Sequence, residues 1–263
     1  MSLVLTPQTE QAAWKDTRIG RFTASTFGAL MVQPRNKADR EAGKFGATAQ
    51  ALIRAKAIER LTGTWMSDGE SSFSMRRGLL LEPAALHILN KHWRPCDPTT
   101  WQPYGDNFGS TPDALVDGGI STMDLKCPAN PADVVAFADE VIDGDFDTLL
   151  GWDLNYAWQI MIQALTSGVK TCWLVYFTDK LAIHTLTDAE REEVQLLIDQ
   201  RADLYSQEHT FPWSYTYASA GYFYAARQFT LTDEIQRTIL DTLERAEVEC
   251  LNTMHRLRPL LTV

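Results

Sequence analysis

The sequence lacks the features that mark several classes of protein. Its 263 residues contain no run of about 18 apolar residues, so we expect no transmembrane helix and no membrane partner. The first sixteen residues have neither a basic start nor a small-residue cleavage site, and we expect no secretory signal peptide. The four cysteines are widely spaced and form no Cys-x-x-Cys pair, which argues against a disulfide framework or a zinc site and favours a reducing cytoplasm.

Common catalytic constellations are also missing. The five histidines show no ligand spacing, and we assign them no catalytic role. No Ser-His-Asp or Cys-His set is grouped in the sequence, which argues against nucleophilic catalysis of that kind. Internal repeats and low-complexity tracts are absent as well, so a solenoid or a disordered scaffold is not expected.

Positive charge is scarce and unevenly distributed. The formal net charge is −10, which taken alone argues against a nucleic-acid partner. Residues 1–60, however, hold ten Lys and Arg against five Asp and Glu, a local net charge of +5, and the remainder carries 14 against 29, a net of −15. An acidic protein can still present a local basic track to phosphates. The charge therefore leaves open both a nucleic-acid partner and an uneven surface without function.

Hydrophobic periodicity predicts an α/β domain with a central mixed β-sheet flanked by helices. We expect a single domain over 1–263, with a core at about 14–210 and a C-terminal helical extension at 211–263. Residues 33–46 are interpreted as a mobile loop, and the acidic stretch 130–153 as a loop with a short helix. The predicted helices are 47–61, 76–92 (with Pro83 at a start or a kink), 153–168, 188–207 and 231–257, and the predicted strands are 107–117, 121–127, 171–178 and 181–186. A turn at Asp179 and Lys180 predicts that the last two strands form a hairpin.

The most informative residues are Asp113, Asp124 and Lys126. Side chains alternate faces along a strand, so Asp124 and Lys126 point to the same side. A hairpin turn at Gly118 and Gly119 brings the strand of Asp113 alongside. Two carboxylates form a hard oxygen site for Mg²⁺, and a lysine beside them can stabilise a developing oxyanion, which suits phosphodiester hydrolysis.

This motif alone has low specificity, since an Asp-x-Lys pair in a strand is most often a surface ion pair. The apolar residues around Asp124 favour a buried pair, which needs partners or a metal. Glu82 is a third acid, although a glutamate in a first helical turn is also favoured by the helix dipole. Gln159 and Gln163 lie one turn apart on an otherwise apolar helix, which hints at a polar pocket.

Four blocks of sequence, in this order, resemble the lambda-type phage exonucleases, a branch of the PD-(D/E)xK nuclease superfamily. Any one block is a weak motif, but four in order over residues 14–177 are specific. The resemblance implies a restriction-endonuclease-like nuclease core, and it does not extend to the C-terminal third. The blocks are WKDTRIGRFTAS at 14–25, RGLLLEP at 77–83, STPDALVD followed by MDLKCP, and YAWQIMIQ at 156–163.

The resemblance also implies roles for individual residues. The second acid of the motif is Asp124, where the best-known member has Glu, and the superfamily pattern permits either. That member has Gln-x-Gln where this chain has Gln159 and Gln163, so no role is carried over to Gln163. The implied roles are Asp113, Asp124 and the carbonyl of Leu125 as metal ligands, Glu82 as an acid that binds the metal or its water, Lys126 as the catalytic lysine, and Gln159 as a residue that positions the nucleophile or the lysine.

Residues for DNA follow from the same resemblance. Arg18, Ser25 and Thr111 match a pocket that holds the terminal 5′-phosphate, and an arginine with hydroxyl donors suits that anion. On the residues alone, Arg18 could equally be a surface cation and Ser25 a helix cap. Arg35 matches a basic residue that reaches the DNA, and Met75 matches an apolar wedge at the terminal base pair.

The expected activity is a 5′→3′ exonuclease that uses Mg²⁺ or Mn²⁺ and digests one strand of linear double-stranded DNA. It releases 5′-mononucleotides and leaves a 3′ overhang for recombination. The resemblance implies a ring-shaped homotrimer, a single-strand annealing protein as partner, and a bacterial or phage-infected cell. The alternatives are a structure-specific endonuclease of the same fold and a catalytically silent module that binds DNA ends.

Overall fold

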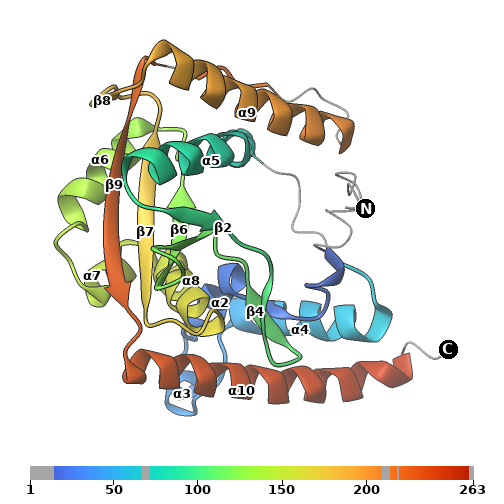
Figure 1. Ribbon diagram of the computed structural model, residues 1–263. Coiled ribbons are helices and arrows are strands. Elements are labelled where there is room, and N and C mark those ends of the chain that lie inside the picture. The colour runs from blue at the N-terminus through green and yellow to red at the C-terminus, as the bar shows by residue number, and fades with distance from the viewer. Residues whose placement is uncertain (1–14, 67–71, 209–213, 218, 261–263) are drawn as a thin grey trace.

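The computed structural model describes residues 15–66, 72–208, 214–217 and 219–260. Its helices surround a curved sheet, with α5 and α9 on one side and α4 and α10 on the other (Figure 1). The residues before 15, on which the signal-peptide prediction rests, lie outside the described part. The helices are α2 (Ala24–Met31), α3 (Lys37–Glu41), α4 (Ala47–Thr62), α5 (Phe73–His92), α6 (Pro131–Glu140), α7 (Phe146–Trp152), α8 (Leu154–Thr166), α9 (Asp188–Glu208) and α10 (Asp233–Leu257).

The main sheet has six strands and is mixed, as expected from the sequence. Its order is β2-β5-β6-β7-β9-β8, in which β6 and β7 are parallel and the other pairs are antiparallel. The chain passes from β6 to β7 through α6, α7 and α8. The strands are β2 (Cys96–Pro98), β5 (Ala114–Val116), β6 (Ser121–Lys126), β7 (Thr171–Thr178), β8 (His184–Thr185) and β9 (Gly221–Thr230).

The central strand β7 shows why the sheet needs helices on both faces. Cys172, Leu174 and Tyr176 are buried on one face, in a core shared with α2, α8 and α10. Val175 and Phe177 are buried on the opposite face, in a core shared with α5 and α9. Because side chains alternate along a strand, a strand such as β7, with six successive apolar or aromatic residues at 172–177, is stable only where both faces are covered.

The hairpin of 107–117 with 121–127 was confirmed by the antiparallel pairing of β5 with β6, but the extent of its first strand and a second predicted hairpin were wrong. The stretch 107–117 is not one strand: β4 (Phe108–Ser110) joins a small sheet with β1 (Phe22–Thr23) and β3 (Gln102–Tyr104), whereas β5 joins the main sheet. The expected hairpin of 171–178 with 181–186 is also absent, since β8 pairs with β9. Distant partners compete with a local turn, and here the distant pairing of β7 with β9 replaces the hairpin.

Other differences concern the loops and the C-terminal part. Residues 33–46 contain the five-residue helix α3, and the acidic stretch 130–153 contains the two helices α6 and α7. The strand β9 was missed; it lies between β7 and β8, so residues 211–263 contribute a strand to the main sheet as well as α10. Helix α5 begins at Phe73 and continues through Pro83. The helix predictions for 47–61, 153–168, 188–207 and 231–257 were confirmed.

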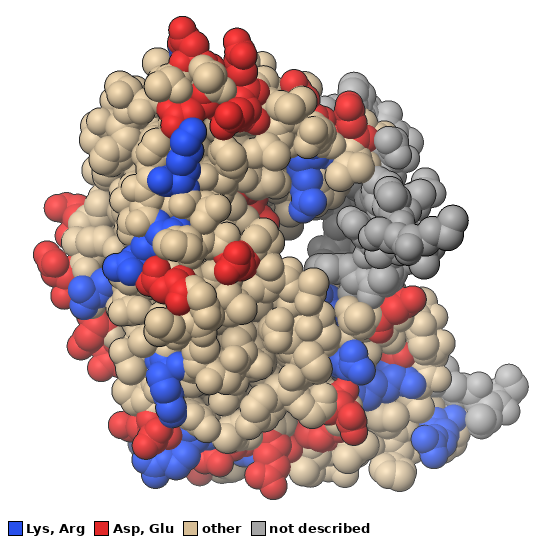
Figure 2. All heavy atoms as spheres, viewed as in Figure 1, with Lys and Arg blue, Asp and Glu red and all other residues tan. Residues whose placement is uncertain are grey.

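No helix within the described ranges is long and apolar enough to cross a membrane. All four cysteines are described and are buried and free, in agreement with the expected absence of disulfide bonds. In the space-filling view the molecule is hollowed between its upper and lower parts, and acidic side chains gather at the top and along the lower edge (Figure 2).

Candidate active site

The hairpin of β5 and β6 places Asp113 beside Asp124. Ala114 pairs with Met123 in the antiparallel register, so Asp113 lies opposite Asp124 at the end of β5. The backbone N–H of Asp113 donates to the carbonyl of Met123 (3.0 Å), and Oδ2 of Asp113 accepts the N–H of Leu125 at 2.6 Å. The main chain of β6 therefore fixes the first carboxylate against the strand that carries the second.

Asp124 is almost completely buried, at 1% exposed, and three side chains contact its carboxylate. Oδ1 accepts hydrogen bonds from Nε2 of Gln159 (2.7 Å) and Nε2 of Gln163 (2.8 Å), both on α8. Oδ2 lies 2.7 Å from Nζ of Lys126. Gln163, to which the resemblance assigned no role, thus makes the same contact as Gln159. One helical turn separates the two amides, so one face of α8 presents both to the same oxygen.

Lys126 is held as a cation. Burial opposes its charge, but the neighbouring carboxylates, Asp124 first and then Asp113, outweigh that effect and raise the pKa of the Lys126 ammonium. Its Nζ also lies 4.3 Å from the ring centre of Tyr156 on α8, in a cation–π arrangement. A lysine in this state donates hydrogen bonds and supplies positive charge; it does not accept a proton at neutral pH.

Glu82, on α5, brings a third carboxylate to the same place. Burial raises the pKa of Glu82, and the charges of Arg201 and Lys126 partly oppose the rise. Burial also raises the pKa of Asp113 well above its usual range, followed by the charges of Glu82 and Asp124. We call Glu82, Asp113, Asp124 and Lys126 the carboxylate cluster. With three acids and one lysine, it has more negative than positive charge.

The donors of this cluster fit a hard divalent cation. In the described ranges no group of three or more His, Cys, Asp and Glu side chains is spaced as a complete metal site. Mg²⁺, however, usually keeps several waters and is held by only one or two carboxylates. Asp113 and Asp124 supply that number, and the raised pKa of Asp113 indicates that the cluster favours an additional positive charge.

A cleft of about 980 Å³ opens over the cluster. Glu82, Asp113, Gln159 and Gln163 line its floor, and Asp124 lies directly beneath the two amides. The remaining walls come from α2, from the segment around Trp101, from α5 and from α9. The fold thus brings together three acids that are separated in the sequence. Glu82 and Asp113 are 31 residues apart, and Asp113 and Asp124 are 11 residues apart.

The predicted phosphate pocket lies in the wall of the same cleft. Arg18 donates from Nη2 to Oγ1 of Thr111 (2.7 Å), and its guanidinium lies over the ring of Trp101 at 5.3 Å. Burial lowers the pKa of Arg18 to about 10, so it stays charged at neutral pH. Ser25 is exposed in the first turn of α2, with its Oγ 3.2 Å from Oγ1 of Thr23, the N-cap residue. Arg18, Ser25 and Thr111 all line the cleft.

The two remaining predicted residues differ in position. Met75, in the first turn of α5, is 59% exposed and lines the cleft, as an apolar wedge would require. Arg35 is exposed in the segment before α3 and does not line the cleft. The structure therefore brings Met75 to the site and leaves Arg35 outside it.

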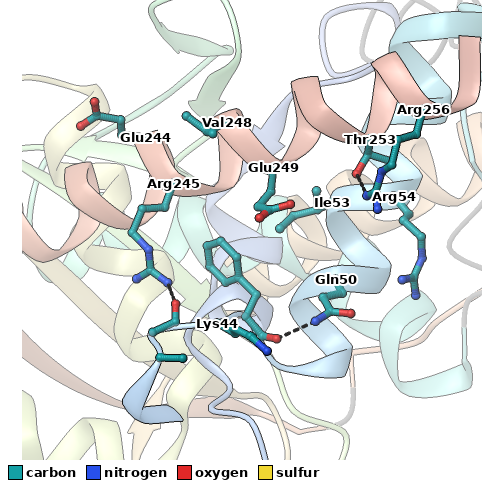
Figure 3. A pocket seen from close by; sticks show the side chains of 13 residues that line it. Lys44, Gln50, Ile53, Arg54, Glu244, Arg245, Val248, Glu249, Thr253 and Arg256 are labelled. Atoms are coloured by element: carbon teal, nitrogen blue, oxygen red, sulfur yellow. Dashed lines mark hydrogen bonds between the residues drawn. The ribbon is translucent and has the colours of Figure 1, made fainter. Parts of the chain in front are cut away.

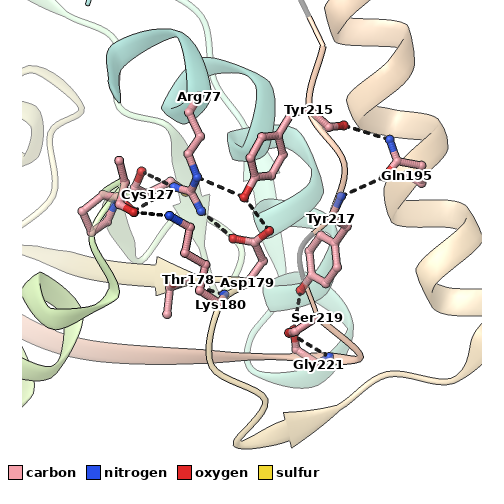
Figure 4. Close-up of polar contacts among 12 residues, drawn as sticks. Arg77, Cys127, Thr178, Asp179, Lys180, Gln195, Tyr215, Tyr217, Ser219 and Gly221 are labelled. Atoms are coloured by element: carbon pink, nitrogen blue, oxygen red, sulfur yellow. Dashed lines mark hydrogen bonds and ion pairs between the residues drawn. The ribbon is translucent and has the colours of Figure 1, made fainter. Parts of the chain in front are cut away.

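A second buried ionic group lies directly behind the end of β6 (Figure 4). Arg77, on α5, donates to Oδ1 of Asp179 (2.5 Å) and to the carbonyls of Cys127 (3.0 Å) and Pro128 (2.8 Å), the two residues that follow Lys126. The hydroxyl of Tyr215 accepts from Nε of Arg77 (3.1 Å) and donates to Oδ2 of Asp179 (2.8 Å). We call Arg77, Asp179 and Tyr215 the Arg77 network. It holds the chain just beyond β6.

Another groove, of about 600 Å³, separates α4 from α10 (Figure 3). Arg245 donates to the carbonyl of Gly43, and Arg256 donates to Oγ1 of Thr253 (3.1 Å). Glutamates and arginines both line it, and it contains no residue of the four sequence blocks. We therefore place the candidate active site in the larger cleft.

Sequence reasoning missed several residues of this cleft. Arg201 and Tyr205 of α9 and Trp101 line it, but a cation or an aromatic residue at an isolated position carries no local signal. Tyr156 begins the fourth sequence block, but no role was assigned to it. The cation–π contact with Lys126 depends on how α8 packs against β6, which the sequence does not reveal.

Comparisons with known proteins show the same fold in nucleases. No protein-family model matches the sequence, and no curated protein matches it either. Among solved structures, the alkaline exonuclease LHK-Exo from Laribacter hongkongensis is similar with a TM-score of 0.58 and 20% identity, over 95% of this chain and 99% of that chain; its complex with dAMP is equally similar. A phage-related exonuclease from Haemophilus somnus 129PT has a TM-score of 0.57 and 16% identity, over 92% and 96% of the two chains. At these identities the likeness shows the fold.

Proposed function

We propose that this protein is a metal-dependent 5′→3′ exonuclease that digests one strand of linear double-stranded DNA. It releases 5′-mononucleotides and leaves a 3′ single-stranded overhang for recombination. The observation that carries the proposal is that Glu82 and Asp113 of the carboxylate cluster line the same cleft as the Arg18–Thr111 pair. The fold shared with an alkaline and a phage-related exonuclease supports it, and dAMP, found with the former, is a mononucleotide of the kind such an enzyme releases.

The carboxylate cluster performs the hydrolysis in this proposal. Asp113, Asp124 and the carbonyl of Leu125 would hold Mg²⁺ or Mn²⁺, with Glu82 nearby to bind it or to orient a water. The cation, when bound, neutralises charge on the phosphate and acidifies a water molecule. Gln159 and Gln163 hold Asp124 in place through Oδ1. Lys126 stays protonated, so it serves as an electrophile that stabilises charge on the phosphate oxygens.

The walls of the cleft select the end of the strand. Arg18 offers a guanidinium, and Ser25 and Thr111 offer hydroxyls, to a terminal 5′-phosphate. Met75 would separate the last base pair, since unstacking an end costs only a few kcal/mol. Arg35, outside the cleft, would contact DNA further along. We also propose a ring-shaped homotrimer, a single-strand annealing partner and action in a bacterial or phage-infected cell, by analogy with the resembling family alone.

The test is digestion of three matched DNA substrates with Mg²⁺: a linear duplex with 5′-phosphate, the same duplex with 5′-hydroxyl, and a covalently closed circle. We expect loss of the phosphorylated strand from its 5′ end, an intact circle and complete inhibition by EDTA. Arg18→Gln should reduce the preference for the phosphorylated end. Cutting of the circle would favour a structure-specific endonuclease, and no cleavage with Mg²⁺ or Mn²⁺ would favour a silent module that binds DNA ends.

A further inference from the structure

Helix α9 presents one face to the cleft, and that face carries a single cation. Leu197, Arg201, Leu204 and Tyr205 line the cleft, and their spacing of three and four residues places them on one side of the helix. Among the described residues that line the cleft, Arg18 and Arg201 are the only Lys or Arg side chains. Two walls of the cleft, built from segments that are far apart in the sequence, therefore each contribute one arginine.

Arg201 shares an unusual state with Arg227 of β9, but of the two only Arg201 lines the cleft. Arg201 forms no hydrogen bond or ion pair with any residue that the structure describes, and its Nε is buried without an acceptor. In contrast, Arg60 pairs with Glu247 at 2.6 Å, and Arg77 forms the network described above. A buried guanidinium N–H without an acceptor is unfavourable, so a group that accepts from Arg201 would be bound with a gain in free energy.

The surroundings of Arg201 favour an anion as this group. Its guanidinium lies over the ring of Tyr205, 5.1 Å from the ring centre. Stacking of this kind occupies the face of the guanidinium and leaves the N–H groups at its edge available for the paired oxygens of a phosphate. Glu82 lies close enough for the charge of Arg201 to influence it, which places Arg201 on the side of the cleft where the acids are.

We infer that Arg201 binds a phosphate in the DNA backbone, on a different wall of the cleft from Arg18. This inference rests on the proposed function, because it assigns the substrate of the same cleft. Arg18 and Thr111 contact the terminal phosphate in that proposal, whereas Arg201, beside Glu82, contacts the phosphate that is cleaved or the next one along the strand. Arg201 is then a substrate-binding residue that acts on every nucleotide, whether or not the end is phosphorylated.

Fluorescence anisotropy tests the inference in EDTA, where binding is measured without hydrolysis. Duplexes with 5′-phosphate and 5′-hydroxyl ends are titrated at several salt concentrations with wild type, Arg201→Gln, Arg201→Lys and Arg18→Gln. Arg191→Gln is the matched control, since Arg191 is on the same helix, pairs with Asp188 and does not line the cleft. Circular dichroism and a thermal melt establish that each variant is folded.

We expect Arg201→Gln to weaken binding of both duplexes by about tenfold, the range of a charge-assisted hydrogen bond. The slope of log K against log salt should become less steep by about 0.9, the value for one phosphate contact on duplex DNA. Arg201→Lys should keep the slope and regain only part of the affinity, because an ammonium lacks the paired donors. Arg18→Gln should weaken only the phosphorylated duplex, and Arg191→Gln should match wild type.

Unchanged affinity and slope in Arg201→Gln, with Arg18→Gln still selective for the phosphorylated end, would overturn the inference and leave the proposed function intact. A loss of cleavage without a loss of binding would also overturn the inference, since Arg201 would then influence only the charge of Glu82 and would not bind DNA. A wild-type protein that binds neither duplex would overturn the proposed function and this inference with it.

Discussion

Two buried ionic groups lie at the end of β6, and they differ in how completely their charges are satisfied. In the Arg77 network one arginine faces one aspartate, and four of its N–H groups have acceptors within the protein. In the carboxylate cluster three acids share one lysine, and burial raises the pKa of both Asp113 and Glu82. The two groups are joined by a few residues of chain, from Lys126 to Pro128.

The difference separates a structural role from a chemical one. A balanced and saturated ion pair has nothing left to bind, so its removal should cost stability. An unbalanced group open to a cleft has binding capacity left for a cation and a phosphate, so its removal should cost activity. The following four experiments test whether stability and activity divide between the two groups in this way.

The largest effect is expected from removing the arginine of the Arg77 network while its partner Asp179 stays. Arg77→Met leaves Asp179, which is fully buried, without its countercharge, and such a change typically costs about 3–5 kcal/mol. Urea denaturation should show the loss in the free energy of unfolding. Arg191→Met, which breaks an exposed pair, is the control and should change stability by less than about 1 kcal/mol. An unchanged midpoint in Arg77→Met would show that the network does not stabilise the fold.

Lys126→Gln tests the carboxylate cluster by its effect on the rate of cleavage. It removes the charge that stabilises the phosphate oxygens, and we expect kcat to fall by about 10²–10³-fold, or ~2.7–4 kcal/mol. Binding of duplex DNA in EDTA should remain. Lys170→Gln, an equal loss of charge at an exposed lysine that pairs with Asp233, should retain wild-type rates. Wild-type kcat in Lys126→Gln would remove the lysine from the reaction.

The pH dependence of metal binding gives a somewhat smaller effect. Because the pKa values of Asp113 and Glu82 are raised in the folded state, the folded protein keeps protons that the unfolded chain has lost. The metal-free protein should therefore lose stability as the pH rises from about 4 through these raised values. Mg²⁺ replaces the protons, so at a hundredfold excess over its Kd it should stabilise by about 2.7 kcal/mol at high pH, and less at pH 5.

Thermal melts with Mg²⁺ and with EDTA measure this effect, which corresponds to about 5–10 °C for a chain of this size. Asp113→Asn is the control, since it removes one of the two raised carboxyls from the cluster. Its melting temperature should depend less on pH and should respond little to Mg²⁺. An equal response in the wild type at pH 5 and pH 8 would contradict the linkage.

The smallest effect is expected from Tyr215→Phe. The change removes a hydroxyl that bridges Arg77 and Asp179 but keeps the ring beside the guanidinium. We expect a loss of about 1 kcal/mol in the free energy of unfolding. The activity of the folded fraction should stay the same, and a large fall in kcat at full stability would show that the network acts on the chemistry as well.

The β5–β6 hairpin was predicted from the sequence better than its surroundings. Asp113, Asp124 and Lys126 are placed by one hairpin with a Gly-Gly turn, and such local geometry can be inferred from alternation and turn residues. The α8 face with Gln159 and Gln163 was also inferred from spacing alone. These features depend on neighbours within the same element or the next one.

Features that depend on distant pairing were not predicted. Residues 221–230 do not alternate regularly between buried and exposed positions, because the environment of β9 changes along its length. Their sequence therefore lacks the period of two that identifies a simple strand. Asp179 was interpreted as a turn residue, whereas Arg77, which is 102 positions away, makes it a buried ion-pair partner. Arg201 looked like any cation on a polar helix, and only the packing of α9 over the cleft distinguishes it.

The break between β4 and β5 has a further consequence. Thr111, which contacts Arg18, and Asp113, which contacts Leu125, are separated by Pro112 alone. Two residues of chain span at most roughly 7 Å, whereas DNA rises ~3.4 Å per nucleotide along one strand. The residue proposed to bind the strand end and the residue proposed to bind the metal are thus joined by a short stretch of backbone that contains a rigid proline. In the proposed reaction a span of this size corresponds to about two nucleotides at most, so each cut removes a very short product instead of a long oligonucleotide.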